Sequence, residues 1–265
     1  MGSRKLQEKH LEVLARNRGF QFTDTFVSYT SGKIGPYYIQ SAVVMKDGRD
    51  YDKAIEDISE MIFNVMNNVN IMDYVVSGGE SRDWIFSFPV AVNLGKPHAM
   101  IYKDGKVFGA DMNGRYVIHV ADLNNEGSSL RDLWVPTIRR EGGKIDDVSF
   151  YVDRMEDGVK VMKDLNLRSH SLVQLDKNAW KYLRKDGVVS KGVYKNLMER
   201  MENKEEWAKK MLQSEEGFKT LFNLAKGNER DRSKVKKILE IGYPEIGDEL
   251  MDRLKEERVD LDWNV

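Results

Sequence analysis

The chain has 265 residues, with 42 Lys plus Arg against 43 Asp plus Glu, no cysteine and 41% hydrophobic residues. The formal charge of -1 excludes a global basic field for wrapping nucleic acid, and no apolar run approaches the ~18 to 20 residues that a membrane span requires. The lack of cysteine excludes disulfides, thiolate zinc sites, iron–sulfur clusters and cysteine nucleophiles together.

The N-terminal segment, residues 1–19, alternates charged with apolar residues and has no uninterrupted signal-peptide core. We therefore expect a cytoplasmic protein, with neither a membrane nor a nucleic acid as its partner. The helical spacing of the apolar residues predicts a first helix that ends near Gly19.

The first two-thirds of the chain alternates short β-rich runs with helical patterns, which is typical of a parallel sheet covered by helices. Apolar runs that lead into polar loops predict strands at residues 74–76, 99–102, 116–121, 148–152 and 172–175. Apolar residues at helical spacing predict helices at residues 52–68, 84–94, 130–140 and 158–165.

The composition changes beyond Asp176. Residues from Asn178 onward are rich in Lys, Glu, Leu and Met, and show no convincing alternation. We expect an α/β domain at residues 1–176 and an α-helical C-terminal extension at residues 177–265. The nearly balanced charges of the extension favour solvated helix faces over a binding patch, although its apolar residues would also suit oligomerisation or partner docking.

A polar loop that contains a glycine follows the strand at residues 116–121 and precedes a helix. A loop of this kind at a helix N-terminus is a place to bind phosphate, because its free amides and the helix dipole favour an anion. Ser128 and Ser129 are equally suited to cap the helix that begins at Leu130, and the two roles are compatible.

Residues 117–129 resemble the phosphoribosyl-pyrophosphate (PRPP) signature of type I phosphoribosyltransferases, in which hydrophobic residues lead to two acids and a small-residue turn. Three further segments resemble elements of orotate phosphoribosyltransferases, in the order in which that family uses them. They are the element that closes over the base, the pyrophosphate loop with its helix, and the mobile lysine loop, at residues 29–40, 77–86 and 102–109. With the last strand pair, at residues 151–158 and 167–175, the resemblance covers about residues 5–176.

This resemblance implies the type I phosphoribosyltransferase fold, which is a central, mainly parallel sheet with flanking helices, followed here by the α-helical extension. It implies a transferase that joins a pyrimidine or a related base to PRPP with release of pyrophosphate, in pyrimidine nucleotide biosynthesis or salvage. Mg²⁺ would be its cofactor. A homodimer in which Lys106 acts in trans is also implied, because the family's mobile loop reaches into the site of the neighbouring subunit.

The resemblance also implies roles for individual residues. Asp122 would bind the ribose and anchor Mg²⁺, while Lys103 and Lys106 would stabilise the departing pyrophosphate. The base would lie against Lys33, Tyr37 and Tyr38. Contacts to PRPP and its phosphates would come from Gly78, Gly79, Asn125, Glu126, Gly127, Ser128 and Ser129.

Most of these roles have a simpler alternative. The two loop lysines are compatible with solvated surface lysines, and Gly78 with Gly79 is compatible with a simple tight turn. Either tyrosine can pack in a core instead of stacking on a pyrimidine.

The chain departs from the family pattern at several of these positions. Ala121 stands at the first of the two acidic positions, so one ribose contact and one potential metal anchor are missing. Glu126 would face a phosphate, and two unit charges ~4 Å apart repel by roughly 1 kcal/mol even in water. Tyr102 and Phe108 replace the arginine and histidine of the mobile loop. These departures favour, as an alternative, a noncatalytic PRPP- or nucleotide-binding regulatory protein on the same fold.

Overall fold

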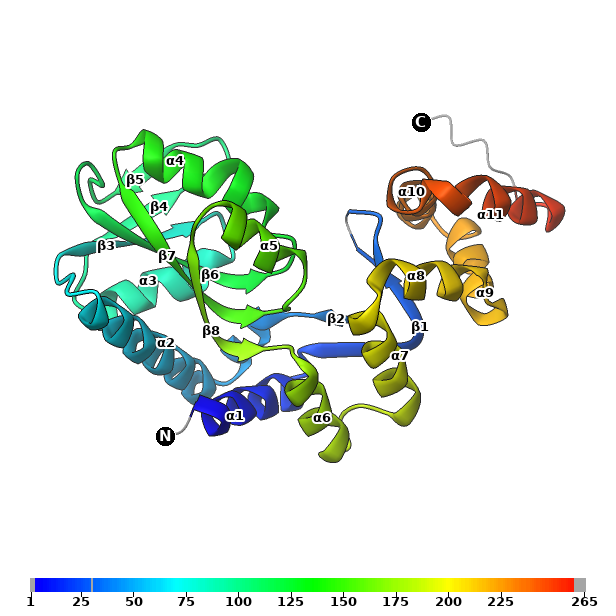
Figure 1. The fold of residues 1–265 in the computed structure, drawn as a ribbon, viewed down its shortest axis with the longest axis horizontal. Coiled ribbons are helices and arrows are strands. Elements are labelled where there is room, and N and C mark those ends of the chain that lie inside the picture. The colour runs from blue at the N-terminus through cyan, green and yellow to red at the C-terminus, as the bar shows by residue number, and fades with distance from the viewer. Residues whose placement is uncertain (1–2, 30, 260–265) are drawn as a thin grey trace. The chain divides into compact units, whose positions relative to one another are not determined.

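The computed structural model describes residues 3–29 and 31–259 and divides the chain into two compact units (Figure 1). Unit 1 contains residues 1–19 and 40–182, and unit 2 contains residues 20–39 and 183–265. This division differs from the one expected at residue 176, because residues 20–39 group with the C-terminal helices. Within the described ranges, no helix is both long and apolar enough to cross a bilayer.

A six-stranded sheet forms the centre of unit 1, in the order β5-β4-β3-β6-β7-β8. Neighbouring strands are parallel except β4 and β5, which form an antiparallel pair at one edge. The five strands expected from the sequence are confirmed, and the short strand β5 is additional to them. The strands are β3 (Tyr74–Gly79), β4 (His98–Ile101), β5 (Val107–Gly109), β6 (Tyr116–Asn124), β7 (Lys144–Asp153) and β8 (Arg168–Gln174).

Helices cover both faces of this sheet, as the mainly parallel arrangement requires (Figure 1). One face carries α1 (Ser3–Arg16), α2 (Gly48–Asn68) and α3 (Asp83–Asn93), with the short helix η1 (Ser41–Lys46) before α2. The other face carries α5 (Asp157–Asp164) and the continuous helical segment of η2 (Leu130–Trp134) and α4 (Val135–Arg140). The helices expected in this part of the sequence are confirmed.

The central strands β3, β6 and β7 are buried along most of their length, which explains why they appear in the sequence as apolar runs and not as alternating patterns. On the α4 side, Val75, Val117 and Phe150 of the sheet pack against Ile138 and Val161 of the helices. This packing fixes the strand ends that carry the candidate site.

Unit 2 combines the antiparallel hairpin β1 (Phe20–Ser28) and β2 (Ile34–Ile39) with helices from the C-terminal part of the chain. The helical character of that part is confirmed, whereas the sequence pattern did not predict the hairpin. Helix α6 (Lys177–Lys185) crosses the boundary between the units. The others are α7 (Lys191–Glu202), α8 (Lys204–Gln213), α9 (Glu215–Ala225), α10 (Glu229–Lys237), η3 (Ile238–Gly242) and α11 (Pro244–Glu256).

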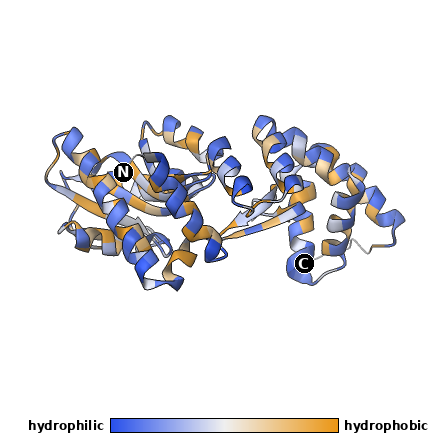
Figure 2. Ribbon diagram, turned by 90° about the horizontal axis from the view of Figure 1, so that it is seen from below, coloured by the Kyte–Doolittle hydropathy of each residue, from blue (hydrophilic) through white to orange (hydrophobic). Residues whose placement is uncertain are grey.

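Four helices of unit 2, α7 to α10, begin at side-chain caps. Ser190, Asn203, Ser214 and Asn228 each accept a hydrogen bond from a backbone N–H in the first turn of the helix that follows. Figure 2 shows hydrophobic and hydrophilic residues alternating along these helices. Their apolar residues and those of the hairpin form one core, which includes Phe26, Ile34, Trp207, Leu221 and Leu250.

Candidate functional site

Three loops that carry predicted site residues lie at the carboxyl-terminal ends of the strands in the unit 1 sheet, which we call the sheet edge. They follow β3, β4 and β6, which are parallel neighbours, so their carboxyl ends meet at the same edge. Ligands of open α/β sheets bind at this edge. The loops after β3 and β4 touch, because the backbone N–H of Lys103 donates to Oε2 of Glu80 at 2.9 Å and the N–H of Glu80 donates to the Ile101 carbonyl at 2.8 Å.

Asp122 is the buried carboxylate of this edge, with 7% of its surface exposed. Its Oδ2 accepts a hydrogen bond from Oγ of Ser41 at 2.7 Å, and its backbone N–H donates to Oδ1 of Asp83 at 3.2 Å. Burial, together with the neighbouring Asp83 carboxylate, raises the pKa of Asp122 to about 6. Asp122 is thus fixed in one orientation by partners from η1 and α3.

The turn after β6 leads directly into a helix that starts at Ser128 and runs to Arg140. Gly127 has a φ of +68°, and a Cβ there would lie 2.9 Å from Cβ of Val161, so only glycine fits. Ser128 and Ser129 are exposed in the first helical turn. Because the first N–H groups of a helix have no intrahelical partner, this turn can present amides and hydroxyls to an anion.

Asn125 and Glu126 complete the turn and are half-buried. The Asn125 carbonyl accepts from the N–H of Gly158 at 2.8 Å, which attaches the turn to α5. Glu126 forms no ion pair with another residue of the described ranges. A phosphate in this turn would therefore require the Glu126 carboxylate to point away from it.

Gly78 and Gly79 are the last residues of β3 and are buried. A Cβ on Gly78 would lie 2.0 Å from Oγ of Ser87, and one on Gly79 would lie 2.2 Å from Cε2 of Trp134. Because neither glycine has a side chain, α3 and Trp134 can pack directly against the strand. The exposed part of this loop is formed by the residues that follow.

Lys103 and Lys106 lie in the tight turn between β4 and β5. The N–H of Tyr102 donates to the Lys106 carbonyl, and the N–H of Gly105 donates to the Tyr102 carbonyl, each at 2.9 Å. Nζ of Lys106 lies 2.7 Å from Oδ2 of Asp104, and both side chains are exposed. Both amines thus lie at the surface of a short, internally bonded turn.

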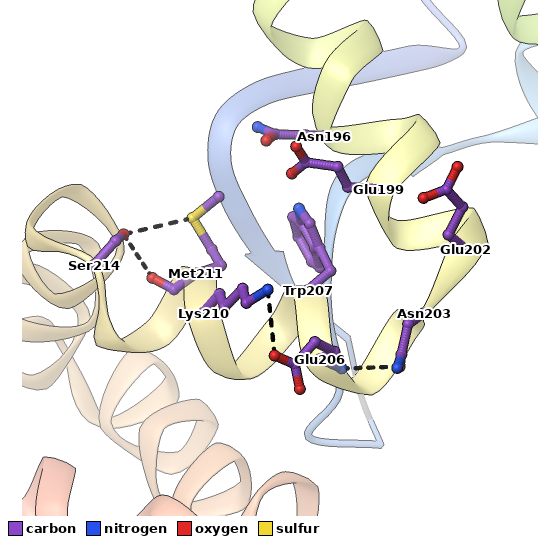
Figure 3. A pocket seen from close by; sticks show the side chains of 9 residues that line it. All are labelled: Asn196, Glu199, Glu202, Asn203, Glu206, Trp207, Lys210, Met211 and Ser214. Atoms are coloured by element: carbon purple, nitrogen blue, oxygen red, sulfur yellow. Dashed lines mark hydrogen bonds and ion pairs between the residues drawn. The ribbon is translucent and has the colours of Figure 1, made fainter.

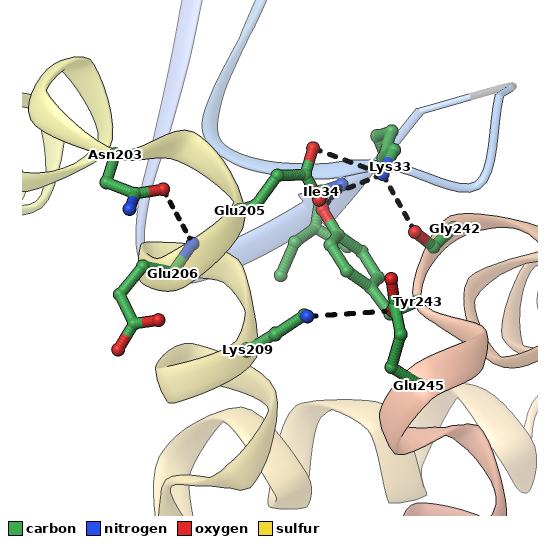
Figure 4. Close-up of polar contacts among 9 residues, drawn as sticks. All are labelled: Lys33, Ile34, Asn203, Glu205, Glu206, Lys209, Gly242, Tyr243 and Glu245. Atoms are coloured by element: carbon green, nitrogen blue, oxygen red, sulfur yellow. Dashed lines mark hydrogen bonds and ion pairs between the residues drawn. The ribbon is translucent and has the colours of Figure 1, made fainter.

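Lys33, Tyr37 and Tyr38 belong to unit 2, whereas the other predicted site residues belong to unit 1. Nζ of Lys33 donates to the Glu205 carboxylate at 2.9 Å and to the Gly242 carbonyl at 2.8 Å (Figure 4). Tyr37 is buried and Tyr38 is half-buried in β2. The ammonium of Lys33 therefore joins the hairpin to two C-terminal helical segments. Thr30, in the same predicted element, lies outside the described residues.

The sequence reasoning missed three residues at the sheet edge. Ser41 and Asp83 both contact Asp122, and they come from segments about 80 and 40 residues away, so no local spacing indicates them. Arg82 is exposed in the loop after β3, and its charge opposes the rise in the pKa of Asp122. Its position directly after Gly78-Gly79-Glu80-Ser81, in the predicted pyrophosphate loop, could have indicated it from the sequence.

Unit 2 has a separate surface hollow of about 360 Å³ beside α7 and α8 (Figure 3). Glu199, Glu202, Glu206 and the edge of Trp207 contribute to its wall, and Lys210 pairs with Glu206 at 3.3 Å. None of the residues predicted for PRPP or the base lines this hollow.

Comparison with known proteins points to one family, although no family model matches the chain. The orotate phosphoribosyltransferase of Methanopyrus kandleri is 27% identical over 176 residues, which are 64% of this chain and 90% of that protein. The orotate phosphoribosyltransferase of Staphylothermus marinus is 30% identical over 181 residues, which are 66% of this chain and 85% of that protein.

Solved structures show the same fold at lower identity. Orotate phosphoribosyltransferase from Aeropyrum pernix has a TM-score of 0.57 at 20% identity, covering 67% of this chain and 99% of that one. The Mycobacterium tuberculosis H37Rv enzyme in complex with PRPP has a TM-score of 0.50 at 20% identity, covering 64% and 96%. With the sheet topology, the sheet-edge loops and the Staphylothermus relative in agreement, the chain belongs to the type I phosphoribosyltransferase family and is similar in sequence to its orotate phosphoribosyltransferases.

Proposed function

We propose that the protein is a transferase that joins a pyrimidine, or a related nitrogen heterocycle, to PRPP and releases pyrophosphate, as part of pyrimidine nucleotide biosynthesis or salvage in the cytoplasm. A bond forms between a ring nitrogen of the base and the anomeric carbon of the ribose, the bond from that carbon to pyrophosphate breaks, and the proton of the ring nitrogen passes to pyrophosphate or to solvent. The observation that carries the proposal is that the loops after β3, β4 and β6 lie at the same end of the sheet, where β6 carries the buried carboxylate of Asp122.

Each loop suits a different part of PRPP. The turn at Gly127 offers amides and two serine hydroxyls to the 5-phosphate, and Asp122 offers a fixed carboxylate to the ribose hydroxyls. Arg82, Lys103 and Lys106 supply positive charge for the pyrophosphate, whose negative charge grows as it departs. The relative of known structure that contains PRPP has the same fold.

Mg²⁺ fits this site as a metal that arrives with the substrate. No group of three or more His, Asp or Glu side chains within residues 3–29 and 31–259 could hold a metal ion alone. Mg²⁺ is often bound by one or two carboxylates plus substrate phosphates, and Asp122 provides such a carboxylate. The metal would supply charge neutralisation for the pyrophosphate.

The base would lie against Lys33, Tyr37 and Tyr38 of the hairpin. An ammonium suits an acidic base such as orotate. Lys33 would offer this ammonium to the base while it is also paired with Glu205. Without a ligand, Nζ of Lys33 has two partners, Glu205 and Gly242, and the ring of Tyr37 is buried.

Pyrophosphate release tests the proposed activity. Purified protein, Mg²⁺ and PRPP are incubated with orotate, uracil, cytosine and adenine in turn, and one base should release pyrophosphate. Lys106→Ala should lower kcat at least tenfold, because a cation that faces the departing pyrophosphate is lost. Lys144→Ala, at the opposite end of the sheet, should leave kcat unchanged. A lack of release with every base would contradict the activity.

A noncatalytic PRPP or nucleotide sensor is the second candidate. Ala121 and Glu126 favour it, because they remove an acid and add a negative charge at the PRPP turn. Titration calorimetry that detects binding of PRPP or a nucleotide without turnover would support this candidate over the enzyme.

We also propose a homodimer that forms through α3. Phe88 and Val92 lie one turn apart on this helix and are 53% and 69% exposed, and Phe63 of α2 is 50% exposed. A second copy that presents the same face would cover these side chains. The wild-type protein should sediment as a dimer, and Phe88→Glu with Val92→Glu should sediment as a monomer. Val159→Glu, on α5, should stay dimeric, and a monomeric wild type would refute the dimer.

A further inference from the structure

The site contains a carboxylate that the family pattern does not account for. We propose that Asp83 is a positioning residue that couples the pyrophosphate loop to the ribose-binding strand, in a chain that lacks the acid at position 121. This inference rests on the proposed binding of PRPP and identifies how this chain holds the two halves of its substrate in register.

Position 121 is unsuitable for a carboxylate in this chain, because of the side chains that surround it. Ala121 is buried and belongs to the apolar cluster on the α4 side of the sheet, with Leu130, Trp134 and Val161. Successive residues of a strand point to opposite faces, so Asp122 lies on the other side. An acid at position 121 would lose its hydration among apolar side chains without a charged partner in that cluster.

Asp83 instead places a carboxylate beside Asp122. It is the first residue of α3 and is 8% exposed. Its Oδ2 accepts from the N–H of Gly79 at 3.2 Å, and its Oδ1 accepts from the N–H of Asp122 at 3.2 Å. One side chain therefore bridges the end of β3, where the pyrophosphate loop begins, and the end of β6, where the ribose would bind.

The imidazole of His119 lies beside the Asp83 carboxylate. Its Nε2 lies 3.4 Å from Oδ2 of Asp83, and its Nδ1 lies 3.0 Å from Oγ of Ser77. The ring is fully buried and stacks on Trp134 with centroids 6.4 Å apart. Ser77, His119, Asp83, Asp122 and Ser41 thus form one buried polar cluster across β3, β6, α3 and η1, in which Nε2 of His119 lies near Asp83 without a hydrogen bond.

The bridge matters because PRPP is pyrophosphate and ribose 5-phosphate joined by one bond. A linked ligand binds more tightly than its halves only if both subsites are held at the matching separation. Removal of the Asp83 carboxylate frees the N–H groups of Gly79 and Asp122, so the two loops can move independently. Loss of the carboxylate should therefore weaken the binding of PRPP, while the binding of pyrophosphate alone and of ribose 5-phosphate alone should change little.

Calorimetry with Mg²⁺ and three probes, PRPP, pyrophosphate and ribose 5-phosphate, tests this inference. In Asp83→Ala, the Kd for PRPP should rise at least tenfold, while the Kd values for the two halves should change less than about threefold. Asp83→Asn should show a smaller rise, because its carbonyl oxygen still accepts from one of the two N–H groups. Asp73→Ala, an exposed acid at the opposite end of β3, should match the wild type.

Two results would overturn the positioning role. The first is unchanged PRPP affinity in both Asp83 variants, and the second is an equal loss for all three probes, which would indicate a single subsite or a general structural role. If Asp83→Ala does not fold, Asp83→Asn provides the same comparison. A wild-type protein that binds none of the probes would instead refute the proposed function, so the two failures are distinguishable.

Discussion

Single residues at the sheet edge combine packing with ligand chemistry. Gly127 is the sharpest case, because its positive φ and its contact with α5 both exclude a side chain in the turn proposed for the 5-phosphate. Glycines elsewhere share the backbone conformation without the contact. Gly95 has a φ of +60°, and a Cβ there would have no atom within 4 Å, so this glycine serves as a matched control.

Gly127→Ala should lower the free energy of unfolding by about 2 to 5 kcal/mol, since the left-handed conformation costs about 1 to 2 kcal/mol and overpacking costs about 1 to 3 kcal/mol more. Gly95→Ala should cost only about 1 to 2 kcal/mol. Urea denaturation measures both values. Calorimetry should show weaker PRPP binding in Gly127→Ala alone. Equal destabilisation in the two variants would mean that Val161 moves away from the new methyl group, so that the proposed overpacking does not occur.

At the scale of elements, a charged cluster joins the strands at the end of the sheet opposite the site. Asp147 of β7 is buried and contacts Arg168 at 2.5 Å and His170 at 2.7 Å, both in β8. The hydroxyl of Tyr116 in β6 donates to the same carboxylate. Burial by itself raises the pKa of Asp147, but the hydrogen bonds from His170, Arg168 and Tyr116 outweigh it and hold the pKa well below its usual range.

This cluster predicts a loss of stability in acid. Because the folded-state pKa of Asp147 is lowered, its contribution is fully present above its unfolded pKa of about 3.9 and is lost as pH falls below that value. Asp147→Asn should lower the free energy of unfolding at pH 7 by about 1.5 to 3 kcal/mol. Thermal unfolding from pH 7 to pH 2 should show the difference between wild type and variant shrinking below pH 4. A difference that is constant with pH would contradict the assignment to this carboxylate.

At the scale of the whole molecule, the N-terminal hairpin depends on helices that lie more than 150 residues further along the chain. Phe26 and Ile34 share a core with those helices, and the N–H of Ile34 donates to the hydroxyl of Tyr243 at 3.1 Å. An isolated two-stranded hairpin is marginally stable in water. The C-terminal helices therefore provide the packing that the hairpin requires.

Removal of residues 186–265 should expose the hairpin and leave the sheet of unit 1 folded. Hydrogen exchange should become fast in residues 20–39 of the truncated protein, while β3, β6 and β7 keep their protection. The full-length chain, measured in parallel, is the control. Continued protection of the hairpin after truncation would show that the shared core is dispensable for it.

The sequence by itself determined the alternation of strands and helices, the helical C-terminal part and the order of the family's segments. These features are local, because apolar runs, helical spacing, caps such as Ser190 and the turn before Ser128 depend on neighbours within a few residues. The identity of the fold class and the place of Asp122 at a strand end could therefore be predicted.

The tertiary structure alone decided which distant residues meet. Ser41 and Asp83 reach Asp122, Lys33 reaches Glu205, and the hairpin joins the C-terminal helices, all across separations that leave no periodic signal. Such contacts arise because the sheet aligns the ends of parallel strands and because each apolar face is buried against whichever element the packing brings to it. The same packing explains Ala121, since its side chain lies in the core and the second carboxylate comes from α3.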